Sequence, residues 1–457
     1  MQKFFGKILD EESTVNKIKK RKILHMLTYY QKIRLQKLLN YLYDNNPFYR
    51  NRLKEIGFEL LEENDLDQIY SRLPIITKED ISNNLCQYID ISFRENFETD
   101  KEFEDYIFQL TNYNNNYCRS YKKNNRCWSI DLTSGSMGIP LPVIKSDQEK
   151  MIFAIRLLKN RKMYYSDATI ENGFLLAHEV DPFISQFEFR KEGYDFREIV
   201  EYFLKKKPKW IFATANTIKK MTKAIKKLHL VDQVAQVKVR FIEVTSESLT
   251  EVEKKEIEEV FKSTIVDQYG SREFWNIAYM CECKEMHVYD SNLIVDICDE
   301  QGQVLEIGQE GKIVVTSLVD KCTPFVKYDL GDNAKIINKK CKCGSSAPIL
   351  QLAKISPREK LKHTPYSGTK VFRRVLKAIY ASLGIKYSRV KIIQDADYHL
   401  SVFVMGCENE EKFKEKFLAV SENIIEELSY FTIDFFFGAT FDSQKDFLKE
   451  QVFICKV

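Results

Sequence analysis

From residue 128 onward, short apolar runs alternate with amphipathic helical segments. The runs Trp210–Ala213, Val239–Val244 and Ser263–Val266 are the right length for buried strands, whereas Thr217–Leu228 and Leu249–Phe261 have helical periodicity. Strands that alternate with helices are typical of an α/β fold with a largely parallel sheet. The sequence therefore predicts an α/β body built on such a sheet.

The segments around this body differ in character. Residues 1–90 are predicted to be helical, with one helix ending at Asn45-Asn46-Pro47 and Thr77 capping another. Residues 95–127 are rich in Asn, Tyr and charge, which indicates a mobile connection. Residues 288–319 predict antiparallel strands, a small β-barrel-like segment of the same body.

A separate module is predicted at the C-terminal end, over residues 361–457. It reads as a helix (Val371–Leu383), two strands (Val390–Gln394 and Leu400–Met405) and a second helix (Glu410–Leu428). This pattern indicates a small α+β domain. The expected fold class is thus a large multi-layered α/β N-terminal body, residues 1–355, with a small α+β C-terminal domain.

Charge and cysteine content exclude several protein classes. The 70 basic and 66 acidic residues among 457 leave a net charge of +4, too small and too dispersed for a dedicated nucleic-acid binder. The N-terminus lacks the apolar core of a signal peptide, and nowhere do roughly 20 apolar residues follow one another as a membrane span requires. We therefore expect a cytoplasmic protein, whose 11 cysteines serve as metal ligands or buried thiols.

The first motif with chemical content is Thr-Ser-Gly-Ser-Met-Gly-Ile-Pro at 133–140, between two predicted strands. Glycines let backbone amides approach an anion, and hydroxyls donate to phosphate oxygens. The loop is not a Walker loop, because no Gly-Lys-Ser/Thr follows. An ordinary hairpin turn is the alternative. The residues expected at phosphate are Thr133, Ser134, Gly135, Ser136 and Gly138.

Two further motifs follow along the chain. Tyr269 and Gly270 come at a strand's carboxyl end, where open α/β sheets bind ligands, and Glu273 offers oxygen ligands for Mg²⁺. Tyr328–Asp332 places Asp332 beyond a glycine, where its carboxylate would accept both hydroxyls of a ribose. The alternatives are a loop with an exposed Glu273 and a turn closing a hairpin.

The order of these three motifs resembles that of the adenylate-forming enzymes. The resemblance is closest to the branch of phenylacetate–CoA ligase and the CapK-type capsule-biosynthesis proteins, and it runs from about residue 40 to 380. Four further sequence segments support the resemblance: Asn46–Arg50, Leu73–Lys78, Gly311–Leu318 and Cys341–Gly344.

The resemblance implies an ATP- and Mg²⁺-dependent acid–thiol ligase. A small carboxylic acid would become an acyl- or aryl-adenylate, and the acyl group would pass to coenzyme A or a carrier protein. The C-terminal domain would be a mobile lid rotating about a hinge at 356–360. A homodimer is expected as the assembly, with no nucleic-acid or membrane partner.

The resemblance also assigns roles to individual residues. The loop at 133–138 would wrap the ATP phosphates. Ser246 and Glu247 would lie on the adenine side, Tyr269 and Gly270 would line the adenine and acyl pocket, and Glu273 would ligate Mg²⁺. Asp332 would bind the ribose, and Arg358 the ribose or a phosphate.

Three departures from the family pattern keep alternatives open. Met137 removes a hydroxyl from the phosphate loop, and Arg272 replaces a threonine beside Glu273, although its guanidinium could also meet phosphate. The family's C-terminal Gly-Lys phrase, which supplies a catalytic lysine, is not recognisable, so Lys445 and Lys449 are both candidates. The alternatives are a nucleotide-binding scaffold with degraded catalysis, and an enzyme that hands the acyl group to an amine or hydroxyl.

Two paired cysteine clusters suggest a metal site. Cys283, His287, Cys341 and Cys343 have the composition of a closed Cys₃His site for structural Zn²⁺, with Cys281 as a spare ligand. Members of the branch that this sequence resembles have similarly placed cysteines. The alternative is a set of buried thiols without metal.

Overall fold

A computed structural model of the chain describes residues 27–58, 66–112, 119–123, 126–133, 141–176, 196–246, 248–355, 357, 360–382, 385–387, 389–438 and 452–457. Within these ranges, no helix combines the length and the apolar character needed to cross a bilayer.

The described residues between 27 and 94 are largely helical, as predicted for the N-terminal region, whereas residues 1–26 lie outside the described ranges. Asn46 separates its first two helices, because the Asn46 side chain accepts the Tyr49 N–H and Pro47 begins the next helix. Thr77 caps a short helix in a reciprocal capping box with Asp80, which confirms the predicted N-cap. The helices are α2 (Tyr29–Asn45), α3 (Pro47–Glu55), α4 (Leu66–Arg72), α5 (Lys78–Ser82), α6 (Leu85–Tyr88) and α7 (Ile91–Arg94).

The prediction of a mobile connection over 95–127 is wrong for the described residues there. They form helix α8 (Asp100–Asn112) and strand β1 (Arg119–Lys123). Phe103, Ile107 and Leu110 recur at helical spacing and are buried in a cluster with Trp128. The polar residues of α8 outnumber its apolar ones, and this composition concealed the apolar face.

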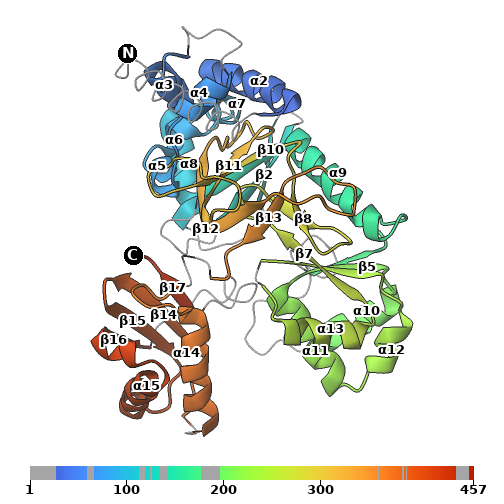
Figure 1. Cartoon of the computed structure of the whole chain (residues 1–457), viewed down its shortest axis with the longest axis vertical. Helices are drawn as coiled ribbons and strands as arrows, with labels where there is room; N and C mark the ends of the chain where they lie inside the picture. Colours follow the sequence, from blue (N-terminus) through green and yellow to red (C-terminus); the bar gives the residue numbers. More distant parts are fainter. Residues whose placement is uncertain are drawn as a thin grey trace, which may run out of the picture.

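The body is built on a ten-stranded mixed sheet, in the order β10-β11-β12-β13-β9-β8-β7-β6-β5-β4 (Figure 1). Three of its parallel strands are the predicted ones: β5 (Trp210–Thr214), β6 (Phe241–Thr245) and β7 (Thr264–Tyr269). The fourth, β4 (Gly173–Leu175), was not predicted. The sheet then continues antiparallel through β8 (Ala278–Met280), β9 (Met286–Val288), β10 (Leu293–Cys298), β11 (Gly311–Ser317), β12 (Tyr328–Ile337) and β13 (Ile349–Leu352).

Helices cover both faces of the parallel strands (Figure 1). On one face lie α10 (Arg197–Lys206), α11 (Ala215–Lys227), α12 (Val231–Gln236) and α13 (Glu251–Phe261). On the other face α9 (Asp147–Tyr164) places Tyr164 against Trp210, Phe241 and Val266. A capping box of Ser146 and Glu149 starts α9. Strands β2 (Arg126–Leu132) and β3 (Pro142–Ser146) complete a three-stranded antiparallel sheet with β1.

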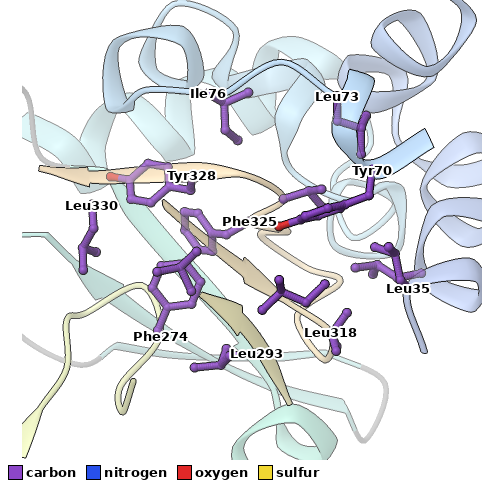
Figure 2. Packing of buried hydrophobic residues seen from close by; sticks show 14 of the residues in the cluster. Leu35, Tyr70, Leu73, Ile76, Phe274, Leu293, Leu318, Phe325, Tyr328 and Leu330 are labelled. Carbon is purple, nitrogen blue, oxygen red and sulfur yellow. The ribbon is translucent and has the colours of Figure 1, made fainter. Parts of the chain in front are cut away.

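The N-terminal helices brace the antiparallel part of the large sheet. Tyr70 and Leu73 lie in one apolar cluster with Phe325 and Tyr328, as Figure 2 shows. Ile76 forms an isolated bridge with Tyr328, donating its N–H to Lys327 O and accepting the N–H of Asp329. The N-terminal region therefore supports the strand that carries the Tyr328–Asp332 motif.

The C-terminal residues have an apolar core of their own, from Leu361 to Cys455. The predicted pattern is present as α14 (Gly368–Lys377), β14 (Arg389–Ala396), β15 (His399–Met405) and α15 (Glu410–Ile424), with a π-helical turn at Ala378–Ser382 and a 3₁₀ turn at Glu426–Tyr430. Two strands were not predicted: β16 (Thr432–Phe437) and β17 (Phe453–Cys455). They complete a sheet ordered β16-β15-β14-β17.

Tyr49 supplies a test of the bracing by the N-terminal helices. Its buried hydroxyl donates to Pro324 O at 3.0 Å and accepts the Val326 N–H at 3.0 Å. Tyr49→Phe leaves that amide buried without a partner, so we expect the free energy of unfolding in urea to fall by about 1–3 kcal/mol. Tyr29→Phe, at an exposed tyrosine, is the control. Equal stability of the two variants would contradict the bracing role.

Candidate functional site

The loop predicted to bind phosphate lies at the end of the β2–β3 hairpin. Leu132 pairs with Pro142, and the Thr133 N–H donates to Leu141 O at 3.0 Å. The Thr133 hydroxyl oxygen accepts the Leu141 N–H at 2.9 Å. The hydroxyl is the acceptor in this bond, so its own hydrogen is not used there. Of the residues expected at phosphate, Ser134, Gly135, Ser136 and Gly138 lie outside the described ranges.

Tyr269 and Gly270 form a tight turn at the carboxyl end of β7. The Ile277 N–H donates to Tyr269 O at 2.8 Å, which folds residues 270–276 back onto the strand end. A Cβ atom at Gly270 would lie 1.9 Å from Trp275 O, so no other residue fits without a backbone shift. The turn therefore fixes the backbone position of Glu273 relative to the end of β7.

Asp332 reaches this turn because β12 bulges. In the register of the two strands, Lys312 of β11 pairs with Asn333 and Val314 pairs with Asp329. An advance of two residues along β11 therefore corresponds to four residues along β12, and the extra residues form a bulge. Gly331 takes a φ of +77° within the bulge. The Tyr269 hydroxyl donates to Asp332 Oδ2 at 3.0 Å, which joins two of the predicted motifs. The alternative of a turn that closes a hairpin does not apply, since the motif lies inside a ten-residue strand.

Glu273 and Arg272 belong to the same region. Glu273 is 8% exposed, and its Oε1 accepts the Tyr328 hydroxyl at 3.1 Å, so the alternative of an exposed glutamate is excluded. Arg272 Nη1 lies 3.2 Å from Asp131 Oδ1 on β2, two residues before Thr133. Arg272 thus links the Tyr269–Glu273 motif to the strand that leads into the phosphate loop.

A buried ion pair supports this arrangement and was not predicted. Lys145 of β3 is 1% exposed, and its Nζ lies 2.7 Å from Asp320 Oδ1 and donates to Glu273 O at 2.9 Å. Burial raises the pKa of Asp320, although the ammonium of Lys145 opposes this shift. A lysine that directly follows the apolar run Leu141–Ile144 is the sequence signal that could have revealed the pair.

The remaining predicted residues fall into two groups. Ser246 is exposed at the carboxyl end of β6, with a φ of +79°. Four residues lie outside the described ranges, so their predicted roles stay predictions: Glu247, Arg358, Lys445 and Lys449.

A second cluster gathers sulfur and nitrogen ligands between the β8–β9 turn and the β12–β13 loop. The ligand atoms of Cys281, His287, Cys341 and Cys343 all lie within 4.8 Å of one another. The Sγ atoms of Cys281 and Cys341 are 3.6 Å apart, and Cys343 Sγ lies 3.4 Å from His287 Nε2. Two thiolates bound to one Zn²⁺ at 2.3 Å in a tetrahedron are about 3.8 Å apart, so the spacing fits a four-ligand site.

The cluster corrects one predicted ligand, since Cys281 takes the position expected for Cys283. The Cys281 N–H donates to Glu285 O and the Lys284 N–H to Cys281 O, so Cys281 is buried at the base of the turn and Cys283 is exposed at its tip. His287 Nδ1 lies 3.0 Å from Ala347 O, which favours the tautomer with Nε2 free to ligate. The Cys343 backbone N–H lowers the pKa of Cys341 to about 6, whereas burial raises the pKa of Cys281 to about 12.

Comparison with known proteins gives a clear result for the fold. No protein-family model and no curated protein matches the sequence. Among solved structures, 2-hydroxyisobutyryl-CoA ligase in the postadenylation state, bound to R3-HIB-AMP, matches with a TM-score of 0.56 at 14% identity over 92% of this chain and 89% of that chain. In its thioesterification state, with 2-HIB-AMP and CoA, it matches with a TM-score of 0.55 at 16% identity over 93% and 88%.

An open conformation of the same ligase matches with a TM-score of 0.52 at 14% identity over 90% of this chain and 88% of that chain. The chain therefore has the mixed α/β fold of the adenylate-forming enzymes, including the C-terminal domain.

The buried Lys145–Asp320 pair allows a direct test of what holds the site. Lys145→Met leaves Asp320 buried without its counter-ion, so we expect the free energy of unfolding in urea to fall by about 3–5 kcal/mol. Lys145→Met/Asp320→Leu removes both charges and should recover most of this loss. Lys150→Met, which breaks the more exposed pair with Asp147, is the control and should cost at most about 1 kcal/mol. Equal losses in Lys145→Met and Lys150→Met would contradict the role of the pair.

Proposed function

We propose that the protein is an ATP-dependent ligase that activates a carboxylic acid as an acyl-adenylate and passes the acyl group to a thiol, of coenzyme A or of a carrier protein. The contact between Tyr269 and Asp332, with the buried Glu273 three residues from Gly270, is the observation that carries the proposal. It places an aromatic ring and two carboxylates from separate motifs at the carboxyl end of β7, where α/β sheets bind nucleotides.

The proposed chemistry has two steps. A carboxylate oxygen of the substrate forms a bond to the α-phosphorus of ATP, the α–β phosphoanhydride bond breaks, and pyrophosphate leaves. A thiol sulfur then bonds to the acyl carbon, AMP leaves, and the thiol proton goes to solvent or a base. Both steps depend chiefly on alignment and charge neutralisation, for which Glu273 would hold Mg²⁺ and Asp332 the ribose.

The fold supports the same proposal. The solved structures of 2-hydroxyisobutyryl-CoA ligase hold an acyl-adenylate and CoA in different states of one enzyme. A chain of this fold would use residues 356–360 as a hinge and its C-terminal domain as a lid, with Arg358 and Lys445 or Lys449 brought to the nucleotide in one state. The phenylacetate–CoA ligase-like branch is the subfamily we propose, on the motifs of the sequence.

Pyrophosphate exchange tests the adenylation step. Protein incubated with ATP, Mg²⁺, labelled pyrophosphate and a panel of aryl, fatty, hydroxy and dicarboxylic acids should form labelled ATP with at least one acid. Glu273→Gln should lower the exchange rate by about 100-fold or more, because the carboxylate proposed to hold Mg²⁺ at the reacting phosphate is lost. Asp332→Asn should lower it by a similar factor, because the ribose loses its charged acceptor and ATP is no longer aligned. Glu306→Gln, at an exposed glutamate, is the control and should leave the rate unchanged.

The outcomes separate the alternatives. Protein that binds ATP but exchanges with no acid would be a nucleotide-binding scaffold. Exchange that continues unchanged in Glu273→Gln would refute the assignment of Glu273. Exchange without thioester formation from coenzyme A would leave a carrier-protein thiol, an amine or a hydroxyl as the acceptor.

We also propose that Cys281, His287, Cys341 and Cys343 bind one structural Zn²⁺. The donor set of three sulfurs and one nitrogen, at tetrahedral spacing, supports this assignment. The ion would tie the β8–β9 turn to the β12–β13 loop, which already meet where His287 pairs with Ile349. It would thereby stiffen the sheet next to the Tyr269–Glu273 motif without taking part in the reaction.

Metal analysis checks the zinc site. Purified protein should contain close to one zinc per chain, and Cys341→Ser should lose most of it together with several degrees of thermal stability. Cys283→Ser, at the exposed neighbouring thiol, is the matched control and should keep the metal. A Cys283→Ser variant that loses zinc while Cys281→Ser retains it would overturn the ligand set.

A further inference from the structure

The hydroxyl of Tyr328 is the part of this residue that apolar packing does not explain. Tyr328 begins β12 and is 3% exposed, and its ring packs against Phe274 and Phe325, with ring centres 6.1 and 5.1 Å away (Figure 2). A phenylalanine would fill the same space, and a buried hydroxyl is costly unless it has a partner. The partner is Glu273, whose Oε1 accepts the hydroxyl at 3.1 Å.

The backbone of Glu273 is fixed without Tyr328. Lys145 Nζ donates to Glu273 O at 2.9 Å, and the tight turn at Gly270 holds the chain just before it. These contacts leave the side-chain torsions of the glutamate unrestricted, so a contact at the carboxylate is needed to select one rotamer. Among the described residues, Tyr328 supplies a hydrogen bond at that carboxylate.

The two oxygens of the Glu273 carboxylate differ in their surroundings. Oε1 accepts the hydrogen bond from Tyr328, whereas no described residue donates a hydrogen bond to Oε2. Glu273 is 8% exposed, so part of the residue remains accessible. A carboxylate oxygen is the ligand type that Mg²⁺ takes, and the ion requires near-octahedral directions. The residues present therefore fit a Mg²⁺ ligand whose direction is set by the hydrogen bond at Oε1.

Tyr328 has a counterpart in the neighbouring motif. The Tyr269 hydroxyl donates to Asp332 Oδ2 at 3.0 Å, and the Tyr328 hydroxyl donates to Glu273. Each of the two motifs thus supplies a tyrosine hydroxyl to the acidic residue of the other. Because the proposed chemistry needs both carboxylates in defined places, this reciprocal pairing is an arrangement that would hold them there.

The main chain of Tyr328 is itself held in place. Its bridge to Ile76 lies between two hydrogen bonds of 2.9 Å, from the Ile76 N–H to Lys327 O and from the Asp329 N–H to Ile76 O. A residue that orients a metal ligand has to be fixed by contacts of its own. Tyr328 meets this condition through the bridge and through the packing of its ring.

We propose that Tyr328 is a positioning residue for the metal ion, and that its hydroxyl holds Glu273 Oε1 so that Oε2 is presented to the Mg²⁺ that accompanies ATP. The inference rests on the proposed function, in which Glu273 ligates Mg²⁺, and it adds the residue that orients this ligand. Tyr328 acts through Glu273 and is not itself a ligand. Loss of such an outer hydrogen bond typically costs about 10–100-fold in metal affinity.

Metal binding tests the inference without turnover. The full chain is titrated with Mn²⁺ at saturating ATP and without acid, because the electron paramagnetic resonance signal of Mn²⁺ reports its binding directly. Tyr328→Phe should raise the Kd of Mn²⁺ by about 10-fold or more, because the Glu273 carboxylate is no longer held in one orientation. An unchanged Kd, or a Tyr328→Phe protein that does not fold, would overturn the inference.

Tyr88→Phe is the matched control. Tyr88 is buried in the same apolar cluster, and its hydroxyl donates to Pro324 O rather than to Glu273. The variant loses a buried hydrogen bond, so its thermal midpoint should fall, but its Kd for Mn²⁺ should stay unchanged. Equal losses of Mn²⁺ affinity in Tyr88→Phe and Tyr328→Phe would show a general loosening of the core and would overturn the positioning role.

A double variant tests whether Tyr328 acts through Glu273. In a Glu273→Gln background, Tyr328→Phe should weaken Mn²⁺ binding no further, because the ligand that it orients is already lost. Independent losses that multiply in the double variant would contradict the inference. Mn²⁺ binding that is unchanged in Glu273→Gln would refute Glu273 as the ligand, and the role of Tyr328 with it.

Pyrophosphate exchange separates this inference from the proposed function. In Tyr328→Phe, the Mg²⁺ concentration for half-maximal exchange should rise by about 10-fold or more, while the rate at saturating Mg²⁺ stays unchanged. A lower rate at saturating Mg²⁺ with an unchanged Mg²⁺ requirement would overturn the inference. No exchange with any acid would refute the proposed ligase, whereas Mn²⁺ binding would still decide the role of Tyr328.

Discussion

The ion pair between Lys145 and Asp320 is the interaction on which the arrangement of the site depends. It joins β3, which leaves the phosphate loop, to the segment between β11 and β12, and the same ammonium holds the backbone carbonyl of Glu273. Phe153 and Trp275 lie over the charge, with ring centres 4.8 and 6.0 Å from Nζ. A buried pair of this kind adds little net stability, but the loss of either partner leaves an unpaired buried charge, so the pair ties the three segments together.

The position of Asp332 depends on a second set of contacts, between the N-terminal helices and β12. The bulge in β12 would be free to relax if its strand were unsupported, yet Ile76 bridges Tyr328 and the hydroxyl of Tyr49 holds the backbone just before the strand. The helical N-terminal region, which carries no predicted catalytic residue, thereby supports the strand that carries Asp332. Its segments Asn46–Arg50 and Leu73–Lys78 supply Tyr49 and Ile76 to this packing.

The sequence predicted those features that depend on local pattern. Strands β5, β6 and β7 were visible because each is a short apolar run between helices, and the three motifs because their residue types and order are distinctive. Helix α8 was missed because only its buried face is apolar, and β16 and β17 because they pair with strands distant in the chain. Lys145 and Cys281 depend on which way a side chain faces after folding, and spacing alone does not supply that information.

Helix α9 shows why a motif leaves the role of a buried charge open. A motif specifies residue types and their spacing, whereas the role of a buried charged side chain depends on the partner that it meets after folding. Arg161 and Arg156 are the same residue type on one buried helix, but Glu243 neutralises the first and no described carboxylate neutralises the second. The difference is a property of the folded chain, because it arises from which strand residue faces each turn.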